Sequence, residues 1–217
     1  MATSTALHQV KSWPSELKTV TLQYNIGSGS PDVSIPLSLP YNSSGQTVME
    51  VAASTDSKFD FTSKYYNKAL GYSLVEIGGK QADESFYWEL LVGPTGSKNL
   101  QRSPSGYSNW IPYDKSTMRW EPAKSVHLII TNIGTKGFDS YVSAGVDTSG
   151  FGIMKAAEDL QFNYDYGAHK VQSIEGVGGN WILSVGPDLG HLSQYTGSIE
   201  EYIPENNYIM KWSIAPQ

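Results

Sequence analysis

Four short stretches decide the fold, and each of them occurs twice in the chain. The first copy reads GYSLV (71–75), YWELLVGP (87–94), WIP (110–112) and Trp120, and the second reads GAHKV (167–171), WILSVGP (181–187), YIP (202–204) and Trp212. Gly lies four residues before Val in both copies, and Trp lies five residues before Gly-Pro in both. Because chance does not preserve several spacings at once, the sequence predicts an internal repeat of one supersecondary unit.

Length and composition favour two small, turn-rich domains. The chain has 217 residues with 21 Gly, 11 Pro and 14 Tyr, and only 17% of its residues are charged, which is typical of a β-rich protein. We expect an N-terminal arm at 1–16, a first domain at 17–123 and a second at 124–217. The connection at 121–124 is too short for the domains to move freely, so a cleft is expected where they meet.

Apolar alternation indicates how each copy begins. Val20, Leu22 and Tyr24 alternate with polar residues, which is the period of a half-buried strand. The strand expected to return at 33–39 contains Pro36, which indicates an edge position or a bulge. A serine or threonine at 43–44 and again at 148–149 can cap a short helix. The order predicts one short helix and several strands in each copy.

Charge and the lack of cysteine exclude several classes of partner and site. The net charge is −6, and most of the acidic excess lies in 124–217, with five Lys or Arg against ten Asp or Glu. An acidic surface does not suit nucleic acid. The absence of Cys excludes disulfides and thiolate metal sites, and no apolar run reaches the ~20 residues of a membrane span.

The cellular location rests on indirect signs. The first residues are too short and polar for a signal peptide, so we presume that a signal peptide was removed and a Met added. Asn42 starts an Asn-Ser-Ser sequon, which suits a surface loop of a secreted protein. We therefore expect a secreted protein that is glycosylated at Asn42.

Catalytic motifs fail when their spacing is checked. A phosphate-binding loop starting at Gly93 would need Gly and Lys at the fifth and sixth following positions, where the chain has Lys98 and Asn99. The stretch 163–167 matches only half of a calcium loop. The four His residues are scattered, and no nucleophile elbow is present. The sequence predicts neither an enzyme nor a metal site.

Aromatic residues are the main candidates for contacts with a ligand. It contains 26 Phe, Trp and Tyr. The four Trp residues that recur on the repeated strands are expected to lie mainly in the core. Aromatic side chains in loops need a partner to cover them, and those beside the Gly-rich loops are candidate ligand contacts: Tyr107, Trp110, Tyr113, Tyr195 and Tyr202.

The repeated unit resembles a known family. FDF (59–61), LVEI (74–77), FYWELLVG (86–93), NWIPYD (109–114) and MRW (118–120) resemble the C-terminal β-domain of the cobalamin carriers transcobalamin and intrinsic factor. In the second copy, WILSVG (181–186) and EYIPENN (201–207) carry the resemblance. It implies an α+β fold with two tandem β-grasp-like domains, β-rich with one short helix each.

The resemblance also implies which residues bind a ligand. In the carriers, the Tyr-Trp strand end and the Ile-Pro loop contact the corrin ring. Carried over by position, these are Tyr87, Trp88, Glu89, Leu90, Leu91, Trp110, Ile111, Pro112 and Tyr113 in the first copy, and Asn180, Trp181, Tyr202, Ile203 and Pro204 in the second.

Two functions from different classes follow. The first is a non-enzymatic carrier of a large conjugated or apolar small molecule, either a corrinoid or a carotenoid-like pigment, held by loop aromatics at the cleft or at a dimer interface. The alternative is an extracellular adhesion module whose aromatics contact a protein or glycan. The sequence leaves open whether the protein forms a homo-oligomer.

Overall fold

The structure is a computed structural model that describes residues 16–26, 33–68, 71–131, 137–158, 160 and 163–215. Apart from Glu16, the predicted N-terminal arm lies outside the described residues. In the N-terminal half (16–123) the elements are β1 (Leu17–Tyr24), β2 (Val33–Pro40), α1 (Gly45–Thr55), the 3-10 turn η1 (Ser57–Phe59), β3 (Phe61–Asn67), β4 (Gly71–Ile77), β5 (Lys80–Gln81), β6 (Tyr87–Pro94) and β7 (Gln101–Arg102). The strand β8 (Ser116–Ile130) then continues into the C-terminal half (124–215).

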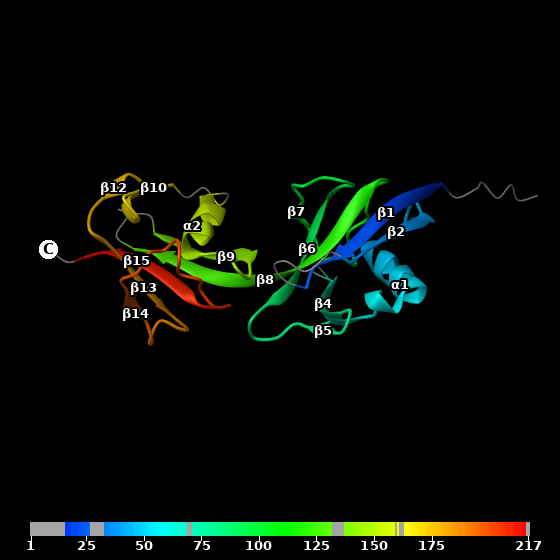
Figure 1. Cartoon of the computed structure of the whole chain (residues 1–217), viewed down its shortest axis with the longest axis horizontal. Coiled ribbons are helices and arrows are strands. Elements are labelled where there is room, and N and C mark those ends of the chain that lie inside the picture. Colours follow the sequence, from blue (N-terminus) through cyan, green and yellow to red (C-terminus); the bar gives the residue numbers. More distant parts are fainter. Residues whose placement is uncertain are drawn as a thin grey trace, which may run out of the picture.

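The C-terminal half follows a similar order of elements. They are β9 (Phe138–Gly145), α2 (Gly150–Glu158), β10 (Tyr164–Gly167), β11 (Lys170–Ile174), β12 (Val177–Gly178), β13 (Trp181–Gly186), β14 (Ser193–Tyr195) and β15 (Ile209–Ile214). Figure 1 shows the two halves side by side along the long axis, with β8 passing from one to the other.

One long strand, β8, organises the main sheet. Its first part pairs with β1 in parallel and with β6 in antiparallel orientation. Its second part pairs with β9 antiparallel and with β15 parallel. Together with β2, β7, β13 and β14 these strands form one nine-stranded mixed sheet. Two three-stranded sheets, β3-β4-β5 and β10-β11-β12, complete the strand structure of the described residues.

The predicted fold class, α+β with two tandem β-grasp-like domains, is wrong. The described part of the chain is dominated by strands and has two short α-helices. A single mixed sheet runs through both halves, and both use β8. The predicted domain bounds stay a prediction, but the boundary after Ala123 falls inside β8 and not in a linker.

Pro122 explains how a strand can pass through the predicted connection. The carbonyl of Trp120 accepts the N–H of Asn25 at 2.9 Å, so even-numbered residues of β8 direct their backbone groups toward the edge that β1 and β9 occupy. On that edge β1 pairs as far as Trp120, and β9 starts at Ala123. Pro122 falls in the gap, where its missing N–H leaves no ladder bond unmade.

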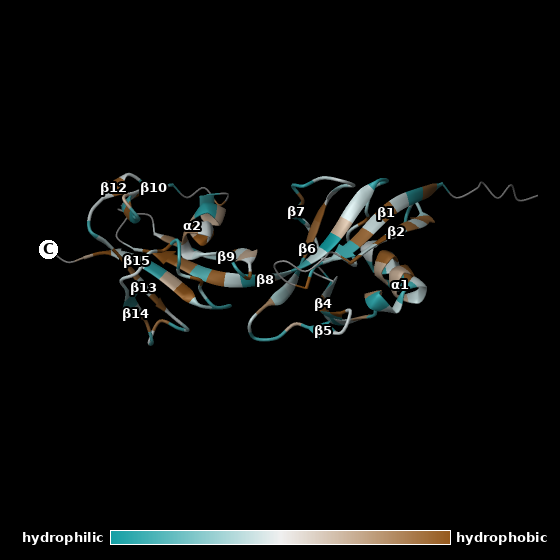
Figure 2. Cartoon of the chain, in the orientation of Figure 1, coloured by the Kyte–Doolittle hydropathy of each residue, from teal (hydrophilic) through white to brown (hydrophobic). Residues whose placement is uncertain are grey.

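Each half has its own hydrophobic core. Val20, Leu22 and Tyr24 are buried, as their alternation predicts, and Figure 2 shows such alternation as bands along the strands. The cores are two separate clusters, one drawn from 20–120 and one from 126–212. Ser44 caps α1 by accepting the N–H of Thr47. Both helices therefore place their buried sides against the main sheet.

Candidate functional site

A cavity of about 510 Å³ opens beside β6 in the N-terminal half. Strand β7 pairs with β6 only at Leu91 and Val92, and the carbonyl of Leu90 accepts the N–H of Ser103 at 2.9 Å, so among the described residues no strand pairs with this edge of β6 before Leu90. We call this cavity the β6 groove, and its lining residues are Tyr66, Tyr72, Ser73, Leu74, Tyr87, Trp88, Glu89, Leu90, Arg102, Ser103, Pro104, Ser105, Gly106, Tyr107 and Trp120. Its volume is in the ordinary range for small-molecule sites.

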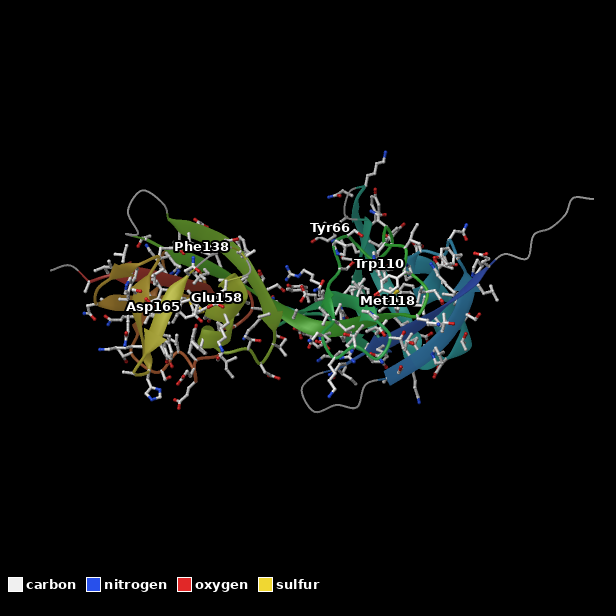
Figure 3. All side chains as sticks on the ribbon, turned by 90° about the horizontal axis from the view of Figure 1, so that it is seen from above. Tyr66, Trp110, Met118, Phe138, Glu158 and Asp165 are labelled. Atoms are coloured by element: carbon white, nitrogen blue, oxygen red, sulfur yellow. The ribbon has the colours of Figure 1, made fainter. Side chains whose placement is uncertain are left out.

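Aromatic rings form much of the wall of the groove. Trp88, Tyr107 and Trp120 are buried, and the Tyr107 and Trp120 rings meet edge to face with centroids 5.5 Å apart. Tyr66 and Tyr72, from β3 and β4, are 64% and 37% exposed at the mouth. In Figure 3 Tyr66 lies at the margin of the N-terminal half. Rings at both depths suit a flat apolar ligand.

A polar network lies along one side of the groove and reaches the other half of the molecule. Arg102 Nε donates to Glu89 Oε1 at 2.5 Å, and Ser143 Oγ donates to the same oxygen at 3.0 Å. Ser143 belongs to β9 and also hydrogen-bonds the hydroxyl of Tyr87. Ala123 lies between Tyr87 and β9 in the sheet, and its small side chain leaves room for this contact.

The two groove phenols of Tyr87 and Tyr107 remain neutral at ordinary pH. Burial raises the pKa of Tyr87, and the hydrogen bond with Ser143 partly opposes this effect. Burial also raises the pKa of Tyr107, with a smaller opposing effect from Ser63. The Tyr107 hydroxyl is buried and makes no hydrogen bond of normal geometry. It is thus a donor available to a ligand acceptor.

The groove contains part of the site predicted from the sequence. Tyr87, Trp88, Glu89, Leu90 and Tyr107 line it. Leu91 is the next residue of β6 and is half-buried, but it does not line the groove. Tyr66, Tyr72 and Arg102 also line it and were missed, because no spacing in the sequence links β3, β4 and β7 to β6.

The predicted Ile-Pro loop lies apart from the groove lining. The carbonyl of Trp110 accepts the N–H of Gly45 at 2.8 Å, so Trp110 supports the start of α1. Pro112 is buried, while Ile111 and Tyr113 are 60% and 46% exposed. The structure therefore does not bring the two predicted segments together as one wall.

The predicted residues of the second copy divide in a similar way. Trp181 is 8% exposed and belongs to the C-terminal core, while Asn180 precedes β13 and is exposed. The rings of Tyr195 and Tyr202 lie 4.7 Å apart beside this core. Ile203 and Pro204 line a different cavity.

This second cavity, of about 520 Å³, lies where the two halves meet, as the sequence led us to expect of a cleft. Its walls come from both: Ile26, Lys80, Glu84, Ser85, Phe86, Pro122, Lys124, Val146, Ile203, Pro204, Glu205 and Asn206. Asn206 Nδ2 bridges the halves by donating to the carbonyl of Glu84 at 3.0 Å. Acidic and basic side chains are both present, so no single ligand charge is favoured.

Two buried lysines were missed by sequence reasoning. Lys18 Nζ donates to the carbonyls of Ser43 and Pro112 at 2.8 and 2.6 Å. Lys124 Nζ donates at 2.8 Å to three carbonyls, those of Val146, Thr148 and Pro204. Each is 1% exposed, and burial lowers the pKa of both, that of Lys124 to about 8.

A signal for these lysines is present in the sequence. Each lies two residues before the first buried Val of its strand, as Lys18-Thr-Val20 and Lys124-Ser-Val126. Each ties the helix-capping loop to the Ile-Pro loop of its half. Their role is therefore to fix loops, because the acceptors of both ammonium groups in the described residues are main-chain carbonyls.

The described residues give no indication of a metal site or a membrane-spanning helix. Within the described ranges, no group of three or more His, Asp or Glu side chains is placed to hold a metal ion. In the same part of the chain, no helix has the length and apolar character to cross a membrane. Asn42 is exposed in the turn between β2 and α1.

Comparison with known proteins finds a weak likeness among solved structures. No protein-family model and no curated protein matches the chain. Among solved structures, the crystal structure of haptocorrin in complex with Cbi is similar, with 21% sequence identity and a TM-score of 0.40. The match covers 50% of this chain and 26% of the haptocorrin chain, so the chain spans about a quarter of that relative's length. It gives no support to the prediction of two such domains in tandem.

Proposed function

We propose that this protein is a non-enzymatic carrier of a large conjugated small molecule, which it holds in the β6 groove. The observation that carries the proposal is that six aromatic residues line one cavity of ligand size: Tyr66, Tyr72, Tyr87, Trp88, Tyr107 and Trp120. Such rings bind flat or extended conjugated molecules through their faces and edges.

The ligand is a corrinoid or a carotenoid-like pigment. The free edge of β6 and the buried hydroxyl of Tyr107 offer a few polar anchors within mainly apolar walls, which is the usual composition of a small-molecule site. The Glu89–Arg102 ion pair adds a charged anchor at one side. A corrinoid, with amides around its rim, would use that pair, whereas a carotenoid-like pigment would use the apolar walls.

The groove suits binding better than catalysis. Its carboxylate, Glu89, already accepts hydrogen bonds from Arg102 and Ser143, and the hydroxyl of Tyr87 is hydrogen-bonded to Ser143. A general base must be free to take a proton from a substrate. These side chains are instead held in place by one another, as in a preformed binding site.

Uptake of a coloured ligand tests this function. The protein would be incubated separately with cyanocobalamin and with β-carotene in mild detergent, freed of excess by gel filtration, and examined by visible absorbance. We expect one of the two pigments to be retained with a shifted band. Loss of both pigments on the column would contradict the proposal.

Two exposed tyrosines provide a matched pair of variants. Tyr66→Ala removes a ring at the mouth of the groove, and we expect it to weaken binding by about fivefold, the effect of one aromatic contact. Tyr113→Ala removes a ring of similar exposure outside the groove and should leave binding unchanged. Equal effects of the two substitutions would place the ligand elsewhere.

A second candidate function is an extracellular adhesion module with a protein or glycan partner. It is favoured by the exposed apolar side chains of the two Ile-Pro loops: Ile111, Tyr113 and Ile203. If neither pigment is retained, these three residues become the first targets for substitution in pull-down experiments.

We also propose that the protein is secreted and glycosylated at Asn42, whose exposure supports access by the modifying enzyme. Expression through the secretory route of a eukaryotic host should give a product that loses mass on enzymatic deglycosylation. Asn42→Gln should remove that loss, and an unmodified wild-type product would contradict the assignment.

A further inference from the structure

One long edge of the main sheet is open. Strand β9 pairs with β8 in an unbroken register from Ala123 and Gly145 to Ile130 and Phe138. In the described residues no strand pairs with its other edge. The even-numbered residues of β8 direct their backbone N–H and C=O groups toward β9 and bond to the even-numbered residues of β9. The odd-numbered residues of β9 therefore direct their N–H and C=O groups away from β8. Asp139, Tyr141, Ser143 and Gly145 therefore present backbone N–H and C=O groups at the free edge.

The corresponding strand of the N-terminal half, β2, is protected against pairing with another strand. The carbonyl of Thr19 accepts the N–H of Lys115, so the odd-numbered residues of β1 direct their backbone N–H and C=O groups toward β8. The residues of β2 that pair with them direct their backbone groups outward, away from β1. These outward residues are Ser34, Pro36, Ser38 and Pro40. Proline has no N–H to offer a neighbouring strand, and proline on edge strands is a common protection against edge-to-edge pairing.

The remaining edges of the described sheets are short or irregular, and the unpaired edge of β6 is limited to the few residues before Leu90 beside the β6 groove. β5, β7 and β12 have two residues each, and β14 has three. β3 and β10 contain register shifts, which interrupt a regular edge. β9 alone among these edges is long, regular and free of proline. At the position where β2 has Pro36, opposite Thr21, β9 has Tyr141, opposite His127.

The side chains of β9 do little to repel a neighbour. Its one charged residue, Asp139, has a carboxylate oxygen 2.6 Å from His127 Nε2, so its charge is turned back toward β8. Tyr141 is 64% exposed and stacks on the His127 ring with centroids 4.4 Å apart. An edge strand that is protected against pairing would instead have a charged side chain directed outward.

We propose that β9 is the interface for a second copy of this chain, paired antiparallel about a two-fold axis at Tyr141. In this register Tyr141 is opposite its own counterpart, Asp139 is opposite Ser143, and Phe138 is opposite Ala144. Each outward-facing residue then meets another outward-facing residue, as the hydrogen-bonded pairs of an antiparallel ladder require. Two copies share one closed, self-complementary interface.

The residues of β9 favour a second copy as the occupant. Self-pairing about Tyr141 sets no like charges opposite one another, because the single Asp meets a Ser. The C-terminal half is acidic overall, with five Lys or Arg against ten Asp or Glu, so two copies repel at long range. Such repulsion is screened by salt, and the dimer should tighten as salt is added.

Sedimentation and substitution test the interface. The apparent mass should rise above 23.8 kDa as concentration increases, and should rise further with salt. Tyr141→Pro gives β9 the proline that β2 has at the same position. It removes an outward N–H and leaves the hydrogen bonds between β9 and β8 in place, so the protein should stay monomeric. Tyr141→Lys places two ammonium groups opposite each other and should have the same effect, while Tyr113→Lys, on an exposed loop, should not.

Hydrogen exchange on the unmodified protein gives a reading that does not depend on variants. Amides of Asp139, Tyr141 and Ser143 should gain protection as concentration rises, whereas those of Ser140 and Val142, already bonded to β8, should not change. A monomer at every concentration, or a dimer that Tyr141→Pro and Tyr141→Lys leave intact, would overturn the proposal. Unchanged exchange of the outward amides would also overturn it and leave the edge to an extended segment of another protein.

Discussion

The two halves of the molecule share a framework but not a binding groove. Both hold a short helix against the sheet, and both tie the Ile-Pro loop to the capping loop with a buried lysine. Where the N-terminal half has Tyr87 and Glu89 flanking its Trp, the C-terminal half has Asn180 and Ile182. Residues that maintain the framework therefore recur, and residues that line the groove differ.

The loop that packs against the start of each helix also supports the fold in both halves but lines the groove in only one. A Cβ on Gly45 would lie 2.4 Å from the carbonyl oxygen of Tyr107, and a Cβ on Gly150 would lie 3.2 Å from that of Ile199. The two loops thus approach their helices at equivalent places. Tyr107 contributes a ring to the groove, whereas Ile199 is a buried member of the C-terminal core. One position can support the fold in both halves and bind a ligand in one.

Removing a buried lysine should have the largest effect. Lys124→Met leaves three carbonyls without their donor, and we expect a loss of about 3 kcal/mol or more in the free energy of unfolding. Lys18→Met removes the donor from two carbonyls and should cost less, about 2 kcal/mol. Urea unfolding at pH 7 measures both, and Lys98→Met, at an exposed position, should change stability by less than about 0.5 kcal/mol. A larger loss from Lys18→Met would reverse this ranking.

Giving the N-terminal half the residues of its counterpart should abolish its groove. The double variant Tyr87→Asn and Glu89→Ile removes one ring and the partner of Arg102, and pigment affinity should fall by tenfold or more, about 1.4 kcal/mol. Retention on the gel-filtration column measures the effect. Ile182→Ala, at the equivalent site of the C-terminal half, is the control. If that control weakens binding as much as the double variant, the halves do not differ in this way.

Much of the framework could be predicted from the sequence. Alternation gave the strand around Val20, Leu22 and Tyr24 and its buried face, and Pro36 correctly indicated that β2 lies at an edge. The strand β8, which both halves share, could not be predicted, because a proline usually indicates that a strand is interrupted. Pro122 is tolerated because it lies at the point where β1 has ended and β9 has not yet begun. That gap depends on where two other strands end.

The groove could be predicted only in part, for a related reason. The repeated spacing from Trp to Gly-Pro identifies the part of β6 that carries Tyr87 and Trp88, because that spacing lies within a single strand. Arg102 and Tyr66 come from strands brought together by folding, and Ser143 comes from the other half. Position matching also assigned Pro112 to the site, although its carbonyl instead holds Lys18.

Ser143 makes the comparison sharper, because this residue of the C-terminal half hydrogen-bonds two side chains of the groove in the N-terminal half. Ser143→Ala removes hydrogen bonds to Tyr87 and Glu89, and we expect pigment affinity to fall by about fivefold, or about 1 kcal/mol. Because the lost hydrogen bond lowers the pKa of Tyr87, that pKa should rise, which an ultraviolet titration against Tyr87→Phe can detect. Ser140→Ala on the same strand is the control, and an unchanged Tyr87 titration would show that the halves are not coupled there.

The smallest effect is expected at Tyr202, whose buried hydroxyl has no hydrogen-bond partner in the described residues. Burial, with smaller effects from Tyr208 and Glu205, raises the pKa of Tyr202 from 10.0 to about 12. A phenol with a raised pKa favours the folded state below pH 10, and this contribution is lost as pH rises from 10 to 12. Tyr202→Phe should therefore change stability at pH 7 by less than about 1 kcal/mol and move alkaline unfolding to higher pH.

A neighbouring ring provides the control for this last substitution. The hydroxyl of Tyr195 donates to the carbonyl of Ser198 at 3.2 Å, so Tyr195→Phe should cost about 1 kcal/mol at neutral pH. Circular dichroism followed against pH and urea measures both variants. If Tyr202→Phe costs as much as Tyr195→Phe at pH 7, the Tyr202 hydroxyl has a partner. Tyr202 would then differ from Tyr107 of the N-terminal half, whose buried hydroxyl has no hydrogen-bond partner in the described residues.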